Sequence, residues 1–319
     1  MGINWILSRS QIVTSSSLLV TVLVLSGCDW VVMNPSGDIA KQQAFLISLS
    51  TLLMLIVIVP VIVLTILYAW KYRASNKKAE YDPDWHHSAT LETIIWTAPL
   101  VIILVLSGIT FVATHRLDPY APISRISADK PLPENADTLV IEVVALDWKW
   151  LFLYPEQGVA TVNEVAAPVD RPIRFKITSG SVMNSLYIPA LAGQIYAMSG
   201  METSLNAVIN QKGVFDGFSA NYSGHGFSQM RFKFHAMDED GFDAWVDKLR
   251  ASGGSLGSKS YLELEKQTIN HPVVYFGDVE KRLYHDILNL CVETGATCSD
   301  EFMHRDAQGS EDTAELAEK

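Results

Sequence analysis

The stretch Phe218-Ser-Ala-Asn-Tyr-Ser-Gly-His-Gly-Phe-Ser-Gln-Met230 is the most informative part of this chain. It has the frame of a loop that binds two copper ions through two thiolates, an imidazole and a thioether, because soft thiolate and imidazole donors suit copper. The ligand positions hold, in order, Ser219, Ser223, Phe227 and Met230, and an upstream imidazole position holds Asn184. Only Met230 is a copper donor, and a thioether alone is a weak ligand. The sequence therefore predicts that the copper centre cannot form and that this chain binds no metal.

This loop and several other segments resemble subunit II of the haem–copper terminal oxidases, and specifically the ubiquinol oxidase branch (cytochrome bo type). The other matching segments are Asp147-Trp-Lys-Trp150, Tyr154-Pro-Glu-Gln-Gly158, Ala160-Thr-Val-Asn-Glu164, Gln194-Ile-Tyr-Ala-Met-Ser-Gly-Met201 and Tyr222-Ser-Gly224. The resemblance runs from about residue 28 to about residue 290. In this family the cytochrome c oxidases keep the copper ligands and the quinol oxidases have lost them. The vacated positions therefore indicate the quinol oxidase branch.

The composition predicts a membrane anchor followed by one soluble domain. Of the 319 residues, 49% are hydrophobic and 18% are charged, and the apolar residues are concentrated before residue 114. The remainder is long enough to build its own core. The formal net charge is −11, from 24 basic and 35 acidic residues. Nucleic acid is not expected as a partner, because phosphate binding requires basic clusters.

The N-terminal segment has the pattern of a signal peptide over residues 1–27. Arg9 precedes an apolar run over residues 12–25 that is too short to span a membrane comfortably, and small residues follow it. The ending Leu25-Ser-Gly-Cys28 resembles a bacterial lipobox, which implies that Cys28 is lipidated. Asp29 resembles the inner-membrane retention signal of Gram-negative lipoproteins. A plain signal peptide remains the alternative.

Two further apolar segments predict a transmembrane hairpin. After a periplasmic N-terminus over residues 28–43, residues 44–70 carry no charge and are long enough to cross a bilayer. A basic cluster opens the loop over residues 71–90 and marks the cytoplasmic side. Residues 91–113 return the chain to the periplasm. We therefore expect a bacterial inner-membrane protein, lipid-anchored and multi-pass, whose large domain lies in the periplasm.

Glu92 is the acid in the second of these segments. From the residues alone, a carboxylate at a helix start is stabilised by the helix dipole, so a structural role suffices. The stretch Leu91-Glu-Thr-Ile-Ile-Trp-Thr-Ala-Pro99 is similar to the second helix of the family. That resemblance implies that Glu92 is a proton-entry residue at the mouth of a path into the catalytic subunit.

Beyond a linker over residues 114–136, the pattern predicts a β domain over residues 137–237. Ile173, Phe175 and Ile177 alternate with polar residues, as do Phe232 and Phe234. Period-two alternation broken by turns favours an antiparallel sandwich with one buried face. The resemblance implies a cupredoxin-like barrel without copper. The expected fold is thus a membrane α-helical hairpin with a periplasmic all-β barrel.

A small helical extension is expected over residues 238–298, with helices at residues 242–250, 260–267 and 279–292. An acidic, disordered tail is expected over residues 299–319. The sequence leaves open whether Cys291 and Cys298 form a disulfide.

Two other groups of side chains are candidates for chemistry. His225, His235 and Met230 invite a mononuclear metal site, but Met230 and His235 differ by an odd number on one strand and so point to opposite faces. Trp148 and Trp150 lie where relatives that use cytochrome c receive electrons. Without copper to accept those electrons, we interpret both tryptophans as packing groups at the barrel or a subunit interface.

The resemblance implies a non-haem, non-copper subunit of a proton-pumping oxidase that oxidises ubiquinol and reduces O₂ to water. The haems and the catalytic copper belong to subunit I, which also binds ubiquinol. The expected partners are subunit I, smaller membrane subunits and membrane lipid, but not cytochrome c. Two alternatives remain at this point: a cytochrome c oxidase subunit II with divergent ligands, and a free-standing lipoprotein that binds copper or a small ligand.

Overall fold

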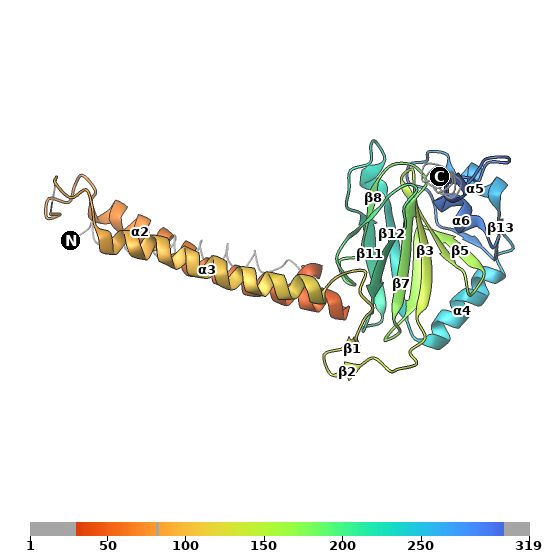
Figure 1. Ribbon diagram of the computed structural model, residues 1–319, viewed down its shortest axis with the longest axis horizontal. Coiled ribbons are helices and arrows are strands. Elements are labelled where there is room, and N and C mark those ends of the chain that lie inside the picture. The colour runs from red at the N-terminus through yellow and green to blue at the C-terminus, as the bar shows by residue number, and fades with distance from the viewer. Residues whose placement is uncertain (1–29, 81–82, 303–319) are drawn as a thin grey trace, which may run out of the picture.

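The computed structural model describes residues 30–80 and 83–302. The predicted signal peptide, Cys28 and most of the acidic tail lie outside these residues. Figure 1 shows a long helical hairpin that projects from a β domain, with short helices on the far side of that domain.

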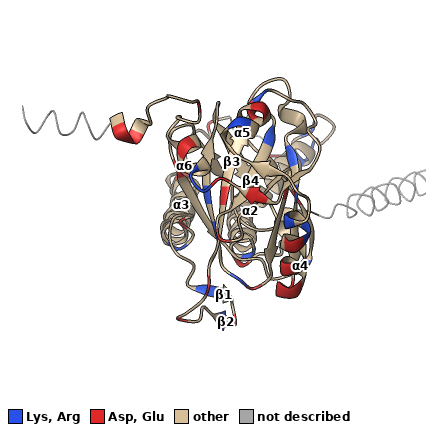
Figure 2. Ribbon diagram, turned by 90° about the vertical axis from the view of Figure 1, so that its right-hand side faces the viewer, with Lys and Arg blue, Asp and Glu red and all other residues tan. Residues whose placement is uncertain are grey.

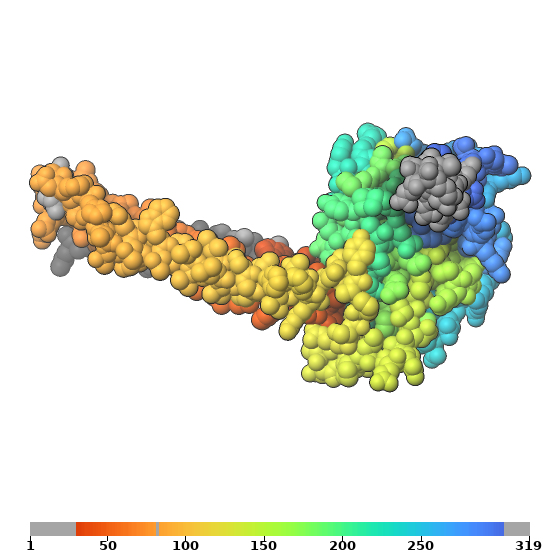
Figure 3. Space-filling view, in the orientation of Figure 1, coloured from red at the N-terminus to blue at the C-terminus, as the bar shows by residue number. Residues whose placement is uncertain are grey.

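The hairpin consists of α2 (Asp38–Lys71) and α3 (Ala89–Arg116). These are the two helices in the described part of the chain that are long and apolar enough to cross a membrane. Their apolar side chains are exposed all round, and Figure 3 shows the pair standing free of the β domain over most of its length. A helix that is apolar on every face needs a lipid or protein environment. Pro60 and Pro99 lie inside the helices.

Both helices extend beyond the apolar segments at residues 44–70 and 91–113. The predicted bounds enclosed only the uncharged apolar residues 44–70. The helix α2 starts six positions before residue 44, at Asp38, which lies in its first turn. The Ser88 hydroxyl caps α3 by accepting a hydrogen bond from the Leu91 amide.

The domain is formed by two packed sheets. One sheet has the strand order β10-β7-β3-β4-β5-β14 and the other has the order β6-β12-β11-β8-β9. The strands of the first sheet are β3 (Leu139–Leu146), β4 (Lys149–Tyr154), β5 (Val159–Val162), β7 (Ile173–Ser179), β10 (Thr203–Ala207) and β14 (Val274–Phe276). Those of the second are β6 (Glu164–Pro168), β8 (Asn184–Tyr187), β9 (Ile195–Ala197), β11 (Gly213–Ser219) and β12 (Arg231–Met237).

The alternation in the sequence predicted the buried faces correctly. In β7, Ile173, Phe175 and Ile177 are buried and face Phe232 and Phe234 of β12 within one core cluster. The prediction of an antiparallel sandwich was wrong for two strand pairs, because β3 pairs with β7 and β12 pairs with β6 in parallel. Side-chain period reports which face is buried and carries no information about the direction of the neighbouring strand.

The extension after the barrel contains α4 (Glu239–Arg250), α5 (Ser258–Glu265) and α6 (Leu283–Leu288), with the two-residue strands β13 (Ser255–Leu256) and β15 (Asp278–Val279). The helix expected at residues 279–292 was too long, because Val279 pairs in a strand with Leu256. Strand β14 also adds to the edge of the first sheet by pairing with β5. A disulfide joins Cys291 to Cys298 and closes the segment after α6.

Charges on the extension follow the local backbone dipoles. Along α4, acids lie in the first turn and Lys248 and Arg250 in the last, and Figure 2 shows both signs on this helix. This arrangement matches the positive N-terminal and negative C-terminal ends of a helix.

A further acid, Glu142 of β3, lies near Tyr284 of α6.

Glu142 predicts a pH-dependent stability of the domain. Burial raises the pKa of Glu142 from 4.5 to about 7, which Lys176 opposes and Glu202 reinforces. Because the folded state then binds this proton more tightly than the unfolded chain, stability falls as pH rises through this interval. Since Glu142 is partly exposed, we expect the free energy of unfolding to fall by about 1 kcal/mol over this interval. Glu142→Gln is expected to abolish this pH dependence.

The measurement is hydrogen exchange of the β3 amides in the detergent-solubilised full chain at about pH 5 and about pH 7.5. Glu263→Gln, at a side chain that is 74% exposed, serves as the control. Equal pH dependence in the two variants would exclude Glu142 as the cause.

Short backbone contacts hold the hairpin to the barrel. The amides of Ser36 and Gly37 donate to the Ala190 carbonyl at 3.0 and 2.8 Å, and the Asn210 amide donates to the Ser36 carbonyl at 3.1 Å. Immediately after them, the buried Asp38 carboxylate pairs with Arg125 of β1 (Arg125–Ser127), with Nε–Oδ2 at 2.8 Å. β1 forms a small ladder with β2 (Lys130–Pro131).

Candidate functional site

The predicted copper loop connects β11 to β12. It leaves β11 after Ser219, passes through the short helix η2 (Phe227–Gln229) and enters β12 after Met230. In Figure 1 this loop lies at the upper end of the barrel, while β1 and β2 lie at the lower end. The upstream position, Asn184, begins β8, which is hydrogen-bonded to β11 in the second sheet. The fold therefore brings together the positions that the sequence singled out.

The side chains at two of the vacated copper-ligand positions form a hydrogen bond with each other. The Ser219 hydroxyl donates to the Asn184 side-chain oxygen at 3.2 Å, and both residues are buried. The Asn184 amide group donates to the Val182 carbonyl at 3.0 Å. The Ser219 backbone amide donates to the Met230 carbonyl at 3.1 Å. Neutral oxygen and amide groups that are already paired offer no thiolate or imidazole to copper.

The remaining positions are also used for packing. The Phe227 ring meets the Tyr222 ring edge-on, with centroids 5.6 Å apart. Met230 is fully buried in the main core cluster. The Ser223 carbonyl accepts a hydrogen bond from the Trp148 indole at 3.0 Å. The side chains present do not fit a binuclear copper centre.

Trp148 packs its ring against the loop between β11 and β12. It adopts a left-handed backbone conformation, φ 65°, and its ring covers the loop at Gly226. A Cβ at Gly226 would lie 2.3 Å from the Trp148 ring, so glycine is required there. Trp150 is fully buried and packs edge-on against Phe232 with centroids 5.8 Å apart. The packing interpretation of both tryptophans is confirmed, since Trp148 also packs, partly buried, against the main core cluster. The contact of Trp148 with the loop was not predicted, and Gly224 and Gly226 were the available signal.

His225, His235 and Met230 do not point toward one common site. His225 is exposed at the tip of the loop, and His235 lies on the outer face of β12 with Nε2 3.5 Å from Glu164 Oε2. Met230 points into the core, as the odd spacing predicted. Within residues 30–80 and 83–302, one cluster has the spacing of metal ligands: His285, Asp286 and Cys298. Cys298 is oxidised in the disulfide and supplies no thiolate.

Comparison with known proteins agrees with this geometry. The chain is 52% identical to cytochrome bo(3) ubiquinol oxidase subunit 2 of Pseudomonas aeruginosa over 85% of this chain and 79% of that protein. It is 48% identical to ubiquinol oxidase subunit 2 of Acetobacter aceti over 85% of each chain. The chain belongs to the ubiquinol oxidase subunit II family.

Two family models match parts of this subunit II. Residues 153–237 match the periplasmic domain of cytochrome c oxidase subunit II, and residues 250–295 match the COX aromatic rich motif. Among solved structures, the periplasmic domain of subunit II of cytochrome oxidase from Bradyrhizobium japonicum is 22% identical, with a TM-score of 0.34 over 37% of this chain and 96% of that chain.

The family assignment confirms the quinol oxidase interpretation over both alternatives. This subunit II is a membrane protein with two spans and a periplasmic cupredoxin-like domain. It is part of an oxidoreductase complex that includes subunit I.

Glu92 of subunit II lies in the first turn of α3, at the end of the hairpin away from the barrel (Figure 1). Its side chain is 53% exposed, and Oε1 lies 2.7 Å from His87 Nδ1 in the preceding loop. The helix dipole favours a carboxylate at this position. Glu92 is thus partly exposed on this chain, at the end of α3 away from the periplasmic domain, and close to a second titratable group.

Lys149 is a buried residue that sequence reasoning did not identify as important. Its ammonium group donates to the Lys266 carbonyl at 2.7 Å and to the Thr268 hydroxyl at 2.8 Å. Burial lowers the pKa of this lysine. Because both partners lie just beyond α5, Lys149 ties the C-terminal extension to the strand that follows Trp148.

Proposed function

We propose that this subunit II belongs to a proton-pumping complex of the bacterial inner membrane that oxidises ubiquinol and reduces O₂ to water. The observation that carries this proposal is the hydrogen-bonded pair of Asn184 and Ser219 in the place of copper ligands. A donor dissolved in the bilayer delivers electrons to subunit I directly. A periplasmic copper relay, and cytochrome c as its donor, then have no role.

On this proposal the haems, the catalytic copper and the quinol site belong to subunit I. Subunit II contributes mainly structure: its hairpin packs on subunit I and on smaller membrane subunits, and its barrel covers the periplasmic face. The continuous apolar exposure of α2 and α3 supports this role, since such surfaces are covered by lipid or protein.

Purification of the complex through a tag on this chain tests the proposal. We expect a haem-bearing partner to co-purify in mild detergent, with oxygen uptake driven by ubiquinol and not by reduced cytochrome c. A colourless monomer, or turnover with cytochrome c alone, would contradict the proposal.

Glu92 is proposed to admit protons from the cytoplasm to subunit I. Its exposure at the cytoplasmic end of α3 and its contact with His87 support this role, because intramembrane and interfacial carboxylates are used in proton relays. We expect Glu92→Gln to slow ubiquinol-driven oxygen uptake by roughly an order of magnitude while haem content stays unchanged. The exposed Glu80→Gln in the same loop is the matched control. Unchanged turnover in Glu92→Gln would exclude the role.

Cys28 is proposed to carry a lipid anchor in the mature protein. Trp30 and the short helix η1 (Val31–Met33) expose apolar side chains just before the periplasmic end of α2, where a lipidated terminus would enter the membrane surface. Mass spectrometry of the intact subunit is expected to show a diacylglyceryl-modified N-terminal cysteine, which Cys28→Ser removes. An unmodified cysteine would show that a plain signal peptide is cleaved instead.

A further inference from the structure

A groove of about 680 Å³ lies between α2 and α3 where the hairpin meets β1. Its volume is within the range of small-molecule and lipid sites. Because the β domain is periplasmic, the groove lies at the periplasmic end of the membrane spans. This is the depth at which lipid headgroups give way to acyl chains.

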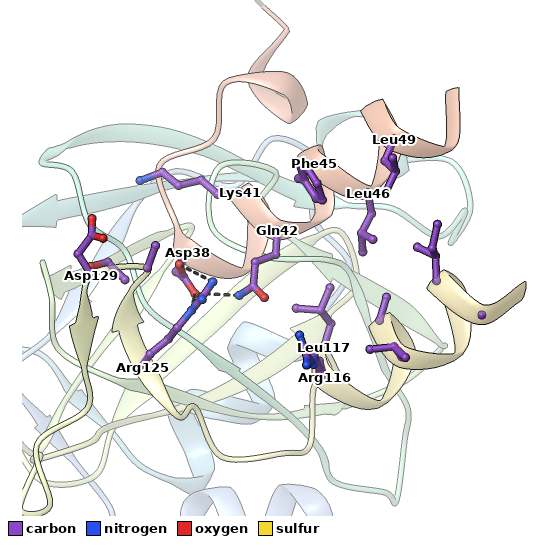
Figure 4. A pocket seen from close by; sticks show the side chains of 16 residues that line it. Asp38, Lys41, Gln42, Phe45, Leu46, Leu49, Arg116, Leu117, Arg125 and Asp129 are labelled. Carbon is purple, nitrogen blue, oxygen red and sulfur yellow. Dashed lines mark hydrogen bonds and ion pairs between the residues drawn. The ribbon is translucent and has the colours of Figure 1, made fainter. Parts of the chain in front are cut away.

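The groove has two chemically distinct ends. Phe45, Leu46 and Leu49 of α2 line one part together with Ile109 and Val112 of α3. Figure 4 shows Phe45, Leu46 and Leu49 following α2 away from β1, while Asp38, Lys41 and Arg125 lie at the end toward β1 and Arg116 lies beside Leu117 at the end of α3, across the groove from Phe45. The lining thus changes from apolar to cationic along the hairpin axis. That order matches an acyl chain inside the membrane and a headgroup outside it.

The charges at the polar end favour an anion. Arg125 is neutralised by the buried Asp38, which also accepts from the Gln42 amide group at 2.8 Å. Lys41 and Arg116 line the same groove, and neither has an acidic partner among the residues that the structure describes. Asp129 is the other carboxylate of the lining. Three cations therefore face two carboxylates, which leaves a positive balance for a phosphate to compensate.

We propose that this groove binds an anionic glycerophospholipid of the periplasmic leaflet, such as phosphatidylglycerol. Lys41 and Arg116 contact its phosphate, and one acyl chain lies along Phe45, Leu46 and Ile109 between the two helices. The Asp38–Arg125–Gln42 cluster holds α2 against β1, so it shapes the polar end of the site. Because β1 belongs to the barrel and α3 to the membrane, a lipid bound here links the two parts of subunit II.

The proposal depends on the membrane orientation of this chain and not on the route of electrons or protons. Its failure is therefore distinguishable from failure of the proposed function. The competing occupant is a helix of subunit I, which would cover the same apolar residues without needing the cations.

Photolabelling of the intact oxidase in nanodiscs tests the proposal. The probe is phosphatidylglycerol with a diazirine in one acyl chain, and the labelled peptides are mapped by mass spectrometry. We expect label on residues 45–49 of α2 and 109–112 of α3. The double variant Lys41→Gln/Arg116→Gln is expected to reduce that label at least fivefold. Lys259→Gln/Lys281→Gln, which removes two exposed cations from the extension, is expected to leave it unchanged.

A second variant tests the apolar end independently. Gly108 lines the groove and a Cβ there meets nothing within 4 Å, so Gly108→Leu adds apolar side-chain volume at the groove wall. We expect it to abolish the label while haem content and subunit I remain. An excess of glycerol 3-phosphate is expected not to compete, since it lacks the acyl chain.

Three results would overturn the proposal. Equal labelling of the double variant and its control would exclude the cations as the headgroup site. Competition by glycerol 3-phosphate would indicate a site for soluble phosphate. Cross-links from residues 45–49 to subunit I, without lipid label, would show that the groove is a protein interface.

Discussion

The combined variant Asn184→His/Ser219→Cys/Ser223→Cys/Phe227→His is expected to bind about two copper ions in the loop between β11 and β12. The fold already brings these positions together, because the Ser219 hydroxyl lies 3.2 Å from the Asn184 side-chain oxygen and the Ser219 amide donates to the Met230 carbonyl. Two thiolates with two imidazoles and the existing thioether supply the donors that hold two copper ions close together. This is the largest effect among the predictions, since the copper content is expected to rise from none to about two ions per chain.

Metal analysis of the purified complex and its near-infrared absorption measure this outcome. The same variant without Ser219→Cys is the matched control, and it is expected to lose the mixed-valence band because one bridging thiolate is missing. If the full variant folds but binds no copper, then the present loop geometry differs from a copper loop by more than its side chains. The contact of Trp148 with Gly226 is the first place to look for such a difference.

Gly37→Ala is expected to weaken the attachment of the hairpin to the barrel by about 3 kcal/mol, the scale of severe overpacking. A Cβ at this position would lie 2.4 Å from the Leu191 carbonyl oxygen and 2.9 Å from that of Val208. Both atoms are backbone, so no side-chain rotation relieves the overlap. The hydrogen bonds from Ser36 and Gly37 to Ala190 must then lengthen or break.

Hydrogen exchange at residues 188–192 and the yield of assembled, haem-bearing complex report this change. We expect faster exchange there and a several-fold lower yield. Gly108→Ala is the control, because its new Cβ meets open space and alanine favours a helix over glycine. Wild-type exchange in Gly37→Ala would mean that the segment before α2 contributes little to docking.

Some features of this protein were predictable because they depend on residue identity or local period. The loss of copper chemistry follows from Ser219 and Ser223, which have no thiol in any fold. The two spans follow from long apolar runs, and the buried faces of β7 and β12 follow from alternation with a period of two. Each of these inferences needs only neighbours along the chain.

Other features depended on contacts between residues far apart in sequence. The Asp38–Arg125 pair joins positions 87 residues apart, and Lys149 reaches a carbonyl 117 residues later. Hydrophobic periodicity and secondary-structure propensity do not identify such long-range partners, because the packing of whole helices and strands determines which residues meet. The parallel pairing of β3 with β7, the addition of β14 to the first sheet and the disulfide were settled in the same way.

The vacated loop shows both contributions at one site. The sequence by itself determined that copper could not bind, because the donor atoms are absent. Only the tertiary structure decided what replaced the metal: a buried hydrogen bond between Asn184 and Ser219, and a tryptophan that needs glycine above it. The reason is physical, since a buried polar group must find a partner and a buried ring must find space, and both are set by the three-dimensional neighbours.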